Sequence, residues 1–182
     1  MARLGFLYDQ TKCIGCSTCQ IACKDKNNLE PGIFFRRTDT LEYVKQGRPV
    51  WMHYSGSCNH CKEAACVKSC PTDSMHYMED GTVGHNPHTC IGCGICTWSC
   101  PYHAPKLSRK LRIAMKCDSC ADRRSQGLKP ACVEACLTHC LDFRDLEELT
   151  EAQKEGWECD LEVLPDSSLT CPSLLIRKNR VL

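Results

Sequence analysis

Short apolar and aromatic segments alternate with polar, cysteine-containing segments along most of this chain. Residues 1–12 include the run GFLYD, which predicts a strand. Residues 24–57 have β-prone segments on both sides of Gln46–Gly47 and predict a hairpin that turns near this pair. Residues 75–87 predict a second hairpin, because Asp80–Gly81 is a strong turn signal between apolar residues.

The C-terminal part of the chain has a different pattern. Leu146, Leu149 and Ala152 are spaced as on one face of a helix, so we expect a short helix there. Residues 161–182 alternate poorly and contain two prolines, which predicts an extended tail on a partner or on the chain's own surface. For the helix itself we favour packing on its own module over docking to a partner, while residues 146–182 as a whole are expected to provide a partner contact.

Composition changes this picture, because the chain is poor in the residues that build a hydrophobic core. Leu, Ile, Val and Phe make up just under a fifth of the 182 residues, while 19 residues are cysteine. The net charge is only +1, so the low apolar content does not indicate disorder. The cysteines cluster in CxxC pairs, which suit a shared metal better than distant disulfides. We therefore expect inorganic clusters to occupy the space of a core, and metal binding to supply much of the folding free energy.

The clearest motif is CIGCGICTWSCP, at residues 90–101. Its four cysteines are separated by two, two and three residues and are followed by Pro101, which is the bacterial ferredoxin pattern for a [4Fe–4S] cluster. Gly92 and Gly94 suit the bends of such a loop, because glycine adopts positive φ without strain. In this pattern three cysteines bind one cluster and the fourth binds its neighbour.

Three further cysteine runs resemble this motif. The first run, at residues 13–23, has the same spacing, and the second, at residues 58–70, has a middle gap of four residues and is also followed by proline. The last run, at residues 117–136, has eleven residues between its second and third cysteines, in a polar insert that predicts a surface loop. Sixteen cysteines in four quartets predict four [4Fe–4S] clusters.

The ferredoxin rule assigns ligands to these clusters if the second run pairs with the third and the first with the last. The predicted ligands are Cys13, Cys16, Cys19 and Cys136 in site 1; Cys58, Cys61, Cys66 and Cys100 in site 2; Cys90, Cys93, Cys96 and Cys70 in site 3; and Cys117, Cys120, Cys132 and Cys23 in site 4.

The predicted fold class is α+β, with two nested ferredoxin-like dicluster modules whose short strands and helices surround the four clusters. Residues 1–57 and 102–145 form the outer module, and residues 58–101 form the inserted inner module. Residues 146–182 follow as the C-terminal helix and tail. The pseudo-symmetry of the two modules places the four clusters in a row.

Zinc is the alternative metal, because structural zinc sites also use four cysteines in CxxC pairs. Zinc usually takes two separated pairs rather than three thiolates on one loop with a trailing fourth, so the spacing favours iron–sulfur clusters. His60, His88 and His103 lie within or beside the runs, and we expect them to tune potentials through hydrogen bonds or to lie at the surface. Saturated clusters leave no open position for a substrate, so we expect a non-catalytic protein without catalytic residues.

Three cysteines remain outside the four sets: Cys140, Cys159 and Cys171. Cys140 follows Cys136 by four residues and is an alternative ligand for site 1, although we favour a small buried side chain beside the cluster. Cys159 and Cys171 are expected to be free thiols, because a disulfide between them requires an oxidising compartment.

Several other functions find no support in the sequence. The chain has no run of 18 apolar residues, so we expect no direct membrane span. Its 23 basic and 22 acidic residues argue against a general nucleic-acid binder. It has no glycine-rich phosphate-binding motif for a nucleotide, and its N-terminus lacks the apolar region of a secretory signal.

The order of the four quartets closely resembles that in the iron–sulfur electron-transfer subunits of the dimethyl sulfoxide reductase family of molybdopterin oxidoreductases. The resemblance covers about residues 3–145 and includes the stretches GFLYDQTKCIGCSTCQIACKDKNNLEPG, SCNHCKEAACVKSCPTDSMH, CIGCGICTWSCPYHAP and KCDSCADRRSQGLKPACVEAC. It implies a complex with a molybdenum or tungsten molybdopterin catalytic subunit, often with a quinol-oxidising membrane anchor. It also implies a cytoplasmic place, or export with a catalytic subunit that carries a twin-arginine signal, with membrane association through the complex. The last run departs from the family, because it reads CLTHC where CP is usual.

The predicted function is electron transfer through four [4Fe–4S] clusters, between the catalytic subunit and a membrane quinol-linked or other redox partner. The alternative is a ferredoxin-like relay in a hydrogenase or formate dehydrogenase complex, which co-purification with a large pterin-containing chain would distinguish. A third hypothesis is a zinc-stabilised scaffold without redox activity, which would be colourless.

Overall fold

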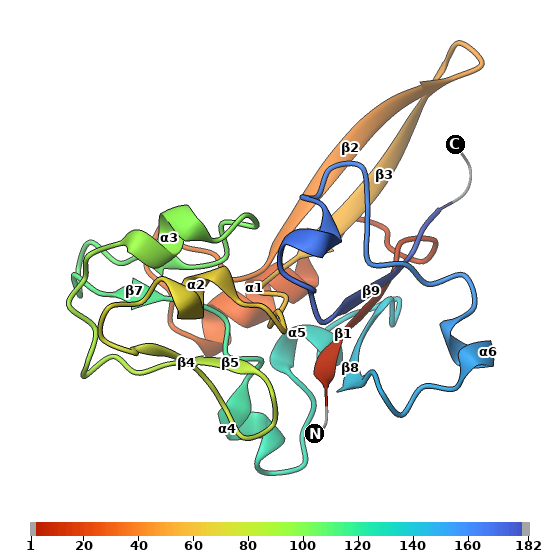
Figure 1. Cartoon of the computed structure of the whole chain (residues 1–182). Helices are drawn as coiled ribbons and strands as arrows, with labels where there is room; N and C mark the ends of the chain where they lie inside the picture. The colour runs from red at the N-terminus through yellow and green to blue at the C-terminus, as the bar shows by residue number, and fades with distance from the viewer. Residues whose placement is uncertain (1–2, 180–182) are drawn as a thin grey trace.

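The chain folds into short strands and short helices grouped around the cysteine runs (Figure 1). The computed structural model describes residues 3–179, so residues 1–2 of the predicted N-terminal segment and 180–182 of the predicted tail lie outside the described residues. The longest strands and the longest helix have nine residues each. The predicted α+β class is confirmed.

A three-stranded sheet brings segments from both ends of the described chain together. β1 (Leu4–Asp9) is its central strand. β8 (Leu141–Asp145) pairs with it antiparallel on one side, and β9 (Leu174–Arg177) pairs with it parallel on the other. The strand predicted near the N-terminus is therefore confirmed, and it lies in the interior of the sheet.

Aromatic side chains on β1 anchor this sheet to the rest of the molecule. Phe6 and Tyr8 are 2% and 0% exposed, and Phe6 packs edge-on against Phe143 of β8 with ring centroids 4.8 Å apart. The Tyr8 hydroxyl donates a hydrogen bond of 2.7 Å to the carbonyl of His53. This bond satisfies the buried hydroxyl and ties the sheet to the hairpin that contains His53.

The predicted hairpin around Gln46–Gly47 is confirmed. β2 (Arg37–Lys45) and β3 (Arg48–Gly56) pair antiparallel over their full length and project from the body of the molecule (Figure 1). Both turn residues have positive φ, 49° at Gln46 and 74° at Gly47, as the tightest hairpin turns require. The hairpin is buried at its base, where Met52 and Tyr54 are nearly inaccessible to solvent.

Two smaller hairpins flank the middle runs. β4 (Met75–Tyr77) and β5 (Val83–His85) form the hairpin predicted around Asp80–Gly81. β6 (Lys106–Leu107) and β7 (Ala114–Met115) form another, which the sequence pattern does not predict because each strand has only two residues.

Within residues 3–179, five helices lie next to the cysteine runs, and four of them pack in pairs. They are α1 (Thr18–Lys26), α2 (Ala65–Lys68), α3 (Ile95–Ser99), α4 (Ala121–Arg124) and α5 (Ala131–Glu134). α1 packs against α5, and α2 packs against α3. The first run is thus packed with the last, and the second with the third. These are the pairs that the ligand rule requires, while the module boundaries themselves stay a prediction.

The C-terminal helix is shorter than the pattern of leucines predicts. α6 (Glu151–Lys154) begins only after Thr150, which forms a capping box with Gln153. Leu146 and Leu149 precede the helix and are buried against the sheet. Their helical spacing therefore reflects burial against the sheet, and the two residues do not lie on one face of a helix.

Part of the expected surface tail is a buried strand at one edge of the sheet. After the 3-10 turn η1 (Ser167–Leu169), the chain enters the sheet as β9, where Leu174 is 4% exposed and Ile176 is 0% exposed. The sequence pattern misses this strand, because only four residues alternate and a parallel partner far away in the sequence leaves no local signal.

The burial of β9 predicts that truncating Ile176 destabilises the whole fold. Ile176→Ala should lower the free energy of unfolding by about 2–5 kcal/mol, because it leaves a cavity in a closed core. Leu169→Ala is the matched control, since Leu169 is 62% exposed in the same region, and it should change stability by less than about 0.5 kcal/mol. Anaerobic denaturant unfolding of both variants measures this. Equal midpoints would mean that β9 does not belong to the core.

Candidate iron–sulfur cluster sites

The four cysteine runs share a backbone feature that shapes their loops. The residue before the second cysteine has positive φ in every run: 69° at Gly15, 45° at His60, 69° at Gly92 and 57° at Ser119. At Gly92 a Cβ would also collide with the carbonyl of Arg112, so only glycine fits there. Sequence reasoning identified this position at Gly92 but missed it at His60 and Ser119, although the alignment of the CxxC pairs marks it.

The structure brings the predicted ligands of site 2 together. Cys58, Cys61, Cys66 and Cys100 line one cavity, and all four are buried. Cys100 comes from the third run and the other three from the second. Burial, followed by the neighbouring thiols, raises the pKa of both Cys61 and Cys66 to about 12. A metal that replaces the thiol protons removes this obstacle to ionisation.

Site 3 shows the reciprocal exchange. Cys90, Cys93 and Cys96 line a second cavity together with Cys70, the last cysteine of the second run. The Cys70 sulfur accepts a hydrogen bond of 3.5 Å from the backbone N–H of Met75. In contrast to site 2, this site reaches the surface, because Cys93 is exposed.

Site 1 contains one more cysteine than its predicted set. Cys13, Cys16, Cys19 and Cys136 line a common cavity with Cys140. The Cys140 sulfur lies 3.4 Å from the Cys136 sulfur and also forms a hydrogen bond with Cys13. That bond lowers the pKa of Cys13 to about 5 and raises the pKa of Cys140. Cys136 and Cys140 thus both face this cavity, and the choice of Cys136 as the fourth ligand of site 1 stays a prediction.

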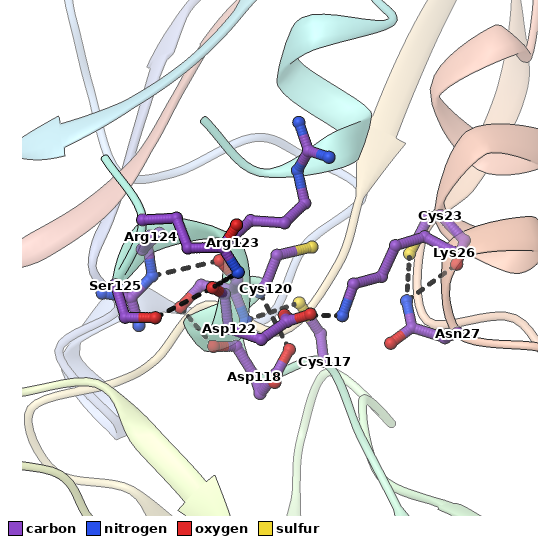
Figure 2. A network of polar contacts seen from close by, with 12 residues as sticks. Cys23, Lys26, Asn27, Cys117, Asp118, Cys120, Asp122, Arg123, Arg124 and Ser125 are labelled. Carbon is purple, nitrogen blue, oxygen red and sulfur yellow. Dashed lines mark hydrogen bonds and ion pairs between the residues drawn. The ribbon is translucent and has the colours of Figure 1, made fainter. Parts of the chain in front are cut away.

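Site 4 is assembled from α1 and the last run. Burial, then the charges of Cys132 and Cys120, raise the pKa of Cys23 to about 12, and Cys23 and Cys132 act likewise on Cys117. Figure 2 shows how the two elements are joined: Lys26 at the end of α1 forms a 2.7 Å ion pair with Asp122 of α4. The polar insert of this run, which was predicted to be a surface loop, consists of the short helix α4 followed by a turn and a loop.

Hydrogen bonds to sulfur surround these thiols. The backbone N–H of Ser119 donates to Cys117 at 3.3 Å. The side-chain amide of Asn27 donates to Cys23 at 3.7 Å (Figure 2). Such donors favour the thiolate and influence the potential of a bound cluster.

The three histidines beside the runs differ in their surroundings. His88 and His103 are exposed, which agrees with the surface position that was one of the two expectations for them. His60 is buried, and its Nδ1 accepts a 3.1 Å hydrogen bond from the backbone N–H of Val83. Burial, together with the charge of Lys116, lowers the pKa of His60 well below its usual range, so its ring is neutral.

A [4Fe–4S] cluster and a zinc ion require different distances between their thiolate ligands. No group of three or more His, Cys, Asp or Glu side chains within residues 3–179 is placed to hold a metal ion. Four sulfurs around one zinc ion lie about 3.8 Å apart, because each Zn–S bond measures about 2.3 Å. A cubane binds each thiolate at a different iron, so its thiolates stand further apart. At sites 1, 2 and 3 the predicted thiol ligands line a common cavity, as is expected if each thiolate binds a different iron of one cluster.

The four sites form a row in the order 1, 4, 2, 3. Sites 1 and 4 share α1, which carries Cys19 and Cys23. Cys117 of site 4 interacts electrostatically with Cys58 of site 2. Sites 2 and 3 meet across one small apolar core. The predicted ligands of the two middle sites are all buried, whereas each end has an exposed cysteine, Cys16 in site 1 and Cys93 in site 3.

Comparison with known families agrees with this geometry. Residues 12–74 and residues 49–146 each match a family described as a 4Fe-4S dicluster domain. The fold and the four thiol-lined sites thus define a ferredoxin-type [4Fe–4S] protein, and two dicluster domains correspond to four clusters.

Individual relatives show which kind of [4Fe–4S] protein this chain resembles. The protein is 40% identical to the B subunit of the anaerobic dimethyl sulfoxide reductase of Escherichia coli (strain K12), over 97% of its own length and 89% of that subunit. It is 38% identical to the thiosulfate reductase electron transfer subunit PhsB of Salmonella typhi, over 78% of its own length and 76% of that subunit. It is 30% identical to the iron–sulfur subunit of the nitrate-inducible formate dehydrogenase of Escherichia coli (strain K12), over 85% of its own length and 58% of that subunit.

The chain belongs to this family of iron–sulfur electron-transfer subunits of oxidoreductase complexes. The predicted family and the predicted [4Fe–4S] cofactors are therefore confirmed. No helix within residues 3–179 has the length and apolar character needed to cross a membrane.

The placement of Cys140 predicts different outcomes for two substitutions. Cys140→Ala should leave all four clusters in place, because it removes a hydrogen-bond donor and not a ligand. Cys136→Ser should remove or convert one cluster. Iron per chain and electron paramagnetic resonance of the reduced protein measure both. If the Cys140 variant loses a cluster and the Cys136 variant keeps it, Cys140 is the ligand.

Proposed function

We propose that the chain relays electrons through four [4Fe–4S] clusters, one in each site with the ligands assigned above. The electrons pass between a molybdopterin catalytic subunit and a membrane quinol-linked or other redox partner. The observation that carries this proposal is the row of four thiol-lined sites with buried cysteines in its middle and an exposed cysteine at each end. Protein around the middle clusters shields them from side reactions, while both ends stay accessible to a partner.

Exposed apolar side chains at both ends support two docking surfaces. Beside site 1, Ile14 is 60% exposed and Leu137 is 67% exposed. Beside site 3, Ile91 is 66% exposed and Trp98 is 87% exposed. Large apolar side chains around a redox centre favour contact with another protein. The two ends of the row would therefore receive electrons from one partner and deliver them to the other.

The donor sets support a non-catalytic role for this chain. Each proposed cluster has one thiolate for each of its four irons, so no iron has an open position for a substrate. The substrate would then be converted on the catalytic subunit. The complex, rather than a span of this chain, would hold it at a membrane, either in the cytoplasm or after export with the catalytic subunit.

The pairing of helices supports two nested dicluster modules. Residues 58–101 would form the inner module, and residues 1–57 with 102–145 the outer one. In this arrangement α2 and α3 hold the inner pair of clusters, and α1 and α5 hold the outer pair. Residues 146–182 would complete the sheet and contact a partner.

A relay in a formate dehydrogenase or hydrogenase complex is the second candidate. The 30% identity to a formate dehydrogenase subunit favours it, although the chain covers only 58% of that protein. The B subunit of dimethyl sulfoxide reductase matches over nearly the full length of both proteins and therefore supports the first candidate more strongly.

The proposal predicts the effect of removing one ligand at the end of the row. The complex purified without oxygen should hold about sixteen irons and as much acid-labile sulfide per chain, because each cubane has four of each. Cys96→Ser should lower the iron content by damaging site 3, and it should slow electron transfer through the complex at least tenfold. Iron analysis and turnover with an artificial donor or the quinol measure this.

Cys159→Ser is the matched control, because Cys159 lies outside all four sets, and it should match the unsubstituted complex. Full iron content and unchanged transfer in the Cys96 variant would contradict the ligand assignment. Zinc in place of iron in the unsubstituted protein would contradict the function itself.

A further inference from the structure

Among the described residues, two buried cations lack a carboxylate partner. Three charged side chains are buried among the described residues: Asp9, Arg36 and Lys116. Asp9 faces cationic partners on Lys12 and Arg177, at 3.7 and 3.9 Å. No carboxylate within residues 3–179 forms an ion pair with Arg36 or Lys116. A buried charge without a counter-charge is strongly unfavourable, so a negative group must face each of them.

Within residues 3–179, the side chain of Arg36 donates hydrogen bonds only to neutral acceptors. One terminal nitrogen donates to the carbonyl and the hydroxyl of Ser55, at 2.9 and 3.2 Å, and the other donates to the hydroxyl of Ser57 at 2.9 Å. The guanidinium lies over the Phe6 ring, 4.6 Å from its centroid, and its Nε has no acceptor. The site therefore holds the cation in a fixed place without neutralising it.

The negative groups around Arg36 are thiols of sites 1 and 4. The Ser55 hydroxyl that accepts from Arg36 lies 3.3 Å from the sulfur of Cys19 in site 1. Both the charge and the backbone N–H of Arg36 oppose the rise in the pKa of Cys23 in site 4 that burial causes. Burial opposes the charge of the guanidinium, but nearby thiolates outweigh burial and raise its pKa, namely those of Cys132, Cys19, Cys117 and Cys23.

Lys116 has the equivalent place between sites 4 and 2. In the part of the chain that the structure describes, its ammonium donates only to the carbonyls of Val83 and Cys117. Its charge acts on Cys117 of site 4 and on Cys66 and Cys100 of site 2, where it opposes the rise in pKa that burial causes. Two histidines near it do not compete as charges, because burial lowers the pKa of both His60 and His85.

We propose that Arg36 and Lys116 are the fixed counter-charges of the row, and that they raise the reduction potentials of the clusters at the two junctions that involve site 4. Arg36 acts on sites 1 and 4, and Lys116 acts on sites 4 and 2. Site 3 lies beyond both. This inference rests on the proposed function, because it requires clusters in these sites. Both residues lie outside the ligand sets and would act on the clusters through their positive charge.

The direction of the effect follows from the charges. An electron that enters a cluster adds one negative charge to a group that already carries four thiolates. A cation held nearby stabilises this reduced form, and the low dielectric of the interior strengthens the attraction. Site 4 is influenced by both cations, so its potential should depend on each of them.

Neutral variants of similar size test the proposal. Arg36→Met should make the reduction of sites 1 and 4 at least tenfold less favourable, which corresponds to about 59 mV or more for one electron. Lys116→Met should do the same to sites 4 and 2. Anaerobic potentiometric titration followed by electron paramagnetic resonance measures the four potentials in the intact complex. In each variant the potentials of two sites should fall, and only the potential of site 4 should fall in both variants. The potential of site 3 should stay unchanged and is the internal control.

Conservative variants separate charge from packing. Arg36→Lys keeps the charge and should return the potentials to within about a factor of three in equilibrium constant of the unsubstituted protein, or about 30 mV. Arg36→Gln keeps hydrogen-bond donors without the charge and should behave as Arg36→Met. Ser55→Ala keeps the cation and removes its contact with Cys19, so its smaller shift should be confined to site 1.

Iron content distinguishes a failure of the proposed function from a failure of the proposed role of the cations. An unsubstituted complex without four [4Fe–4S] clusters would overturn the proposed function. Four intact clusters with unshifted potentials in both methionine variants would overturn only the role of the cations. Equal shifts in Arg36→Lys and Arg36→Met would also overturn it, because packing and not charge would then set the potentials. If Arg36→Met loses iron, Arg36→Gln and Lys116→Met with full iron decide the outcome by the same criteria.

Discussion

The exchange of cysteines between distant runs is the constraint on which the rest of the structure depends. Cys70 lies in the cavity of the third run, and Cys100 lies in the cavity of the second. Such an exchange forces the runs to pack in pairs, and the helices beside them do so, α2 with α3 and α1 with α5. Because the chain has few large apolar residues, buried cysteines make up much of both main cores. The groups that hold the clusters therefore also hold the fold.

Burial along the row determines what each site contributes to electron transfer. The middle sites are enclosed by protein, which excludes solvent and strengthens every charge interaction within them. Enclosure also makes the accumulated negative charge of thiolates costly, and Arg36 and Lys116 offset that cost from within the interior. Site 3 depends least on such cations, because it lies beyond both of them and solvent reaches Cys93. The same exposure leaves apolar side chains available for partners.

Features that depend on neighbouring residues were predicted well. Gln46–Gly47 and Asp80–Gly81 identified the two main hairpins, because a tight turn selects residues that tolerate its dihedral angles. Features that depend on contacts between distant residues were not predicted. Leu146 and Leu149 have helical spacing, yet they lie before α6 and pack on the sheet. β9 was expected to be surface tail, because its parallel partner β1 is almost the whole chain away.

The spacing of the cysteines was enough to indicate the type of cofactor, the four sets of cysteines to test and the family, because the distances between cysteines on one loop are encoded by the number of residues between them. The order of the sites, the exposure of the two ends and the charges that lie between the sites emerge only in the folded chain. Nothing near Arg36 in the sequence indicates that its guanidinium lies one hydroxyl away from Cys19. The fifth thiol of site 1 is a similar case, since only the folded chain shows that Cys140 contacts both Cys13 and Cys136. Such contacts arise where segments far apart in sequence pack together, and local spacing carries no record of them.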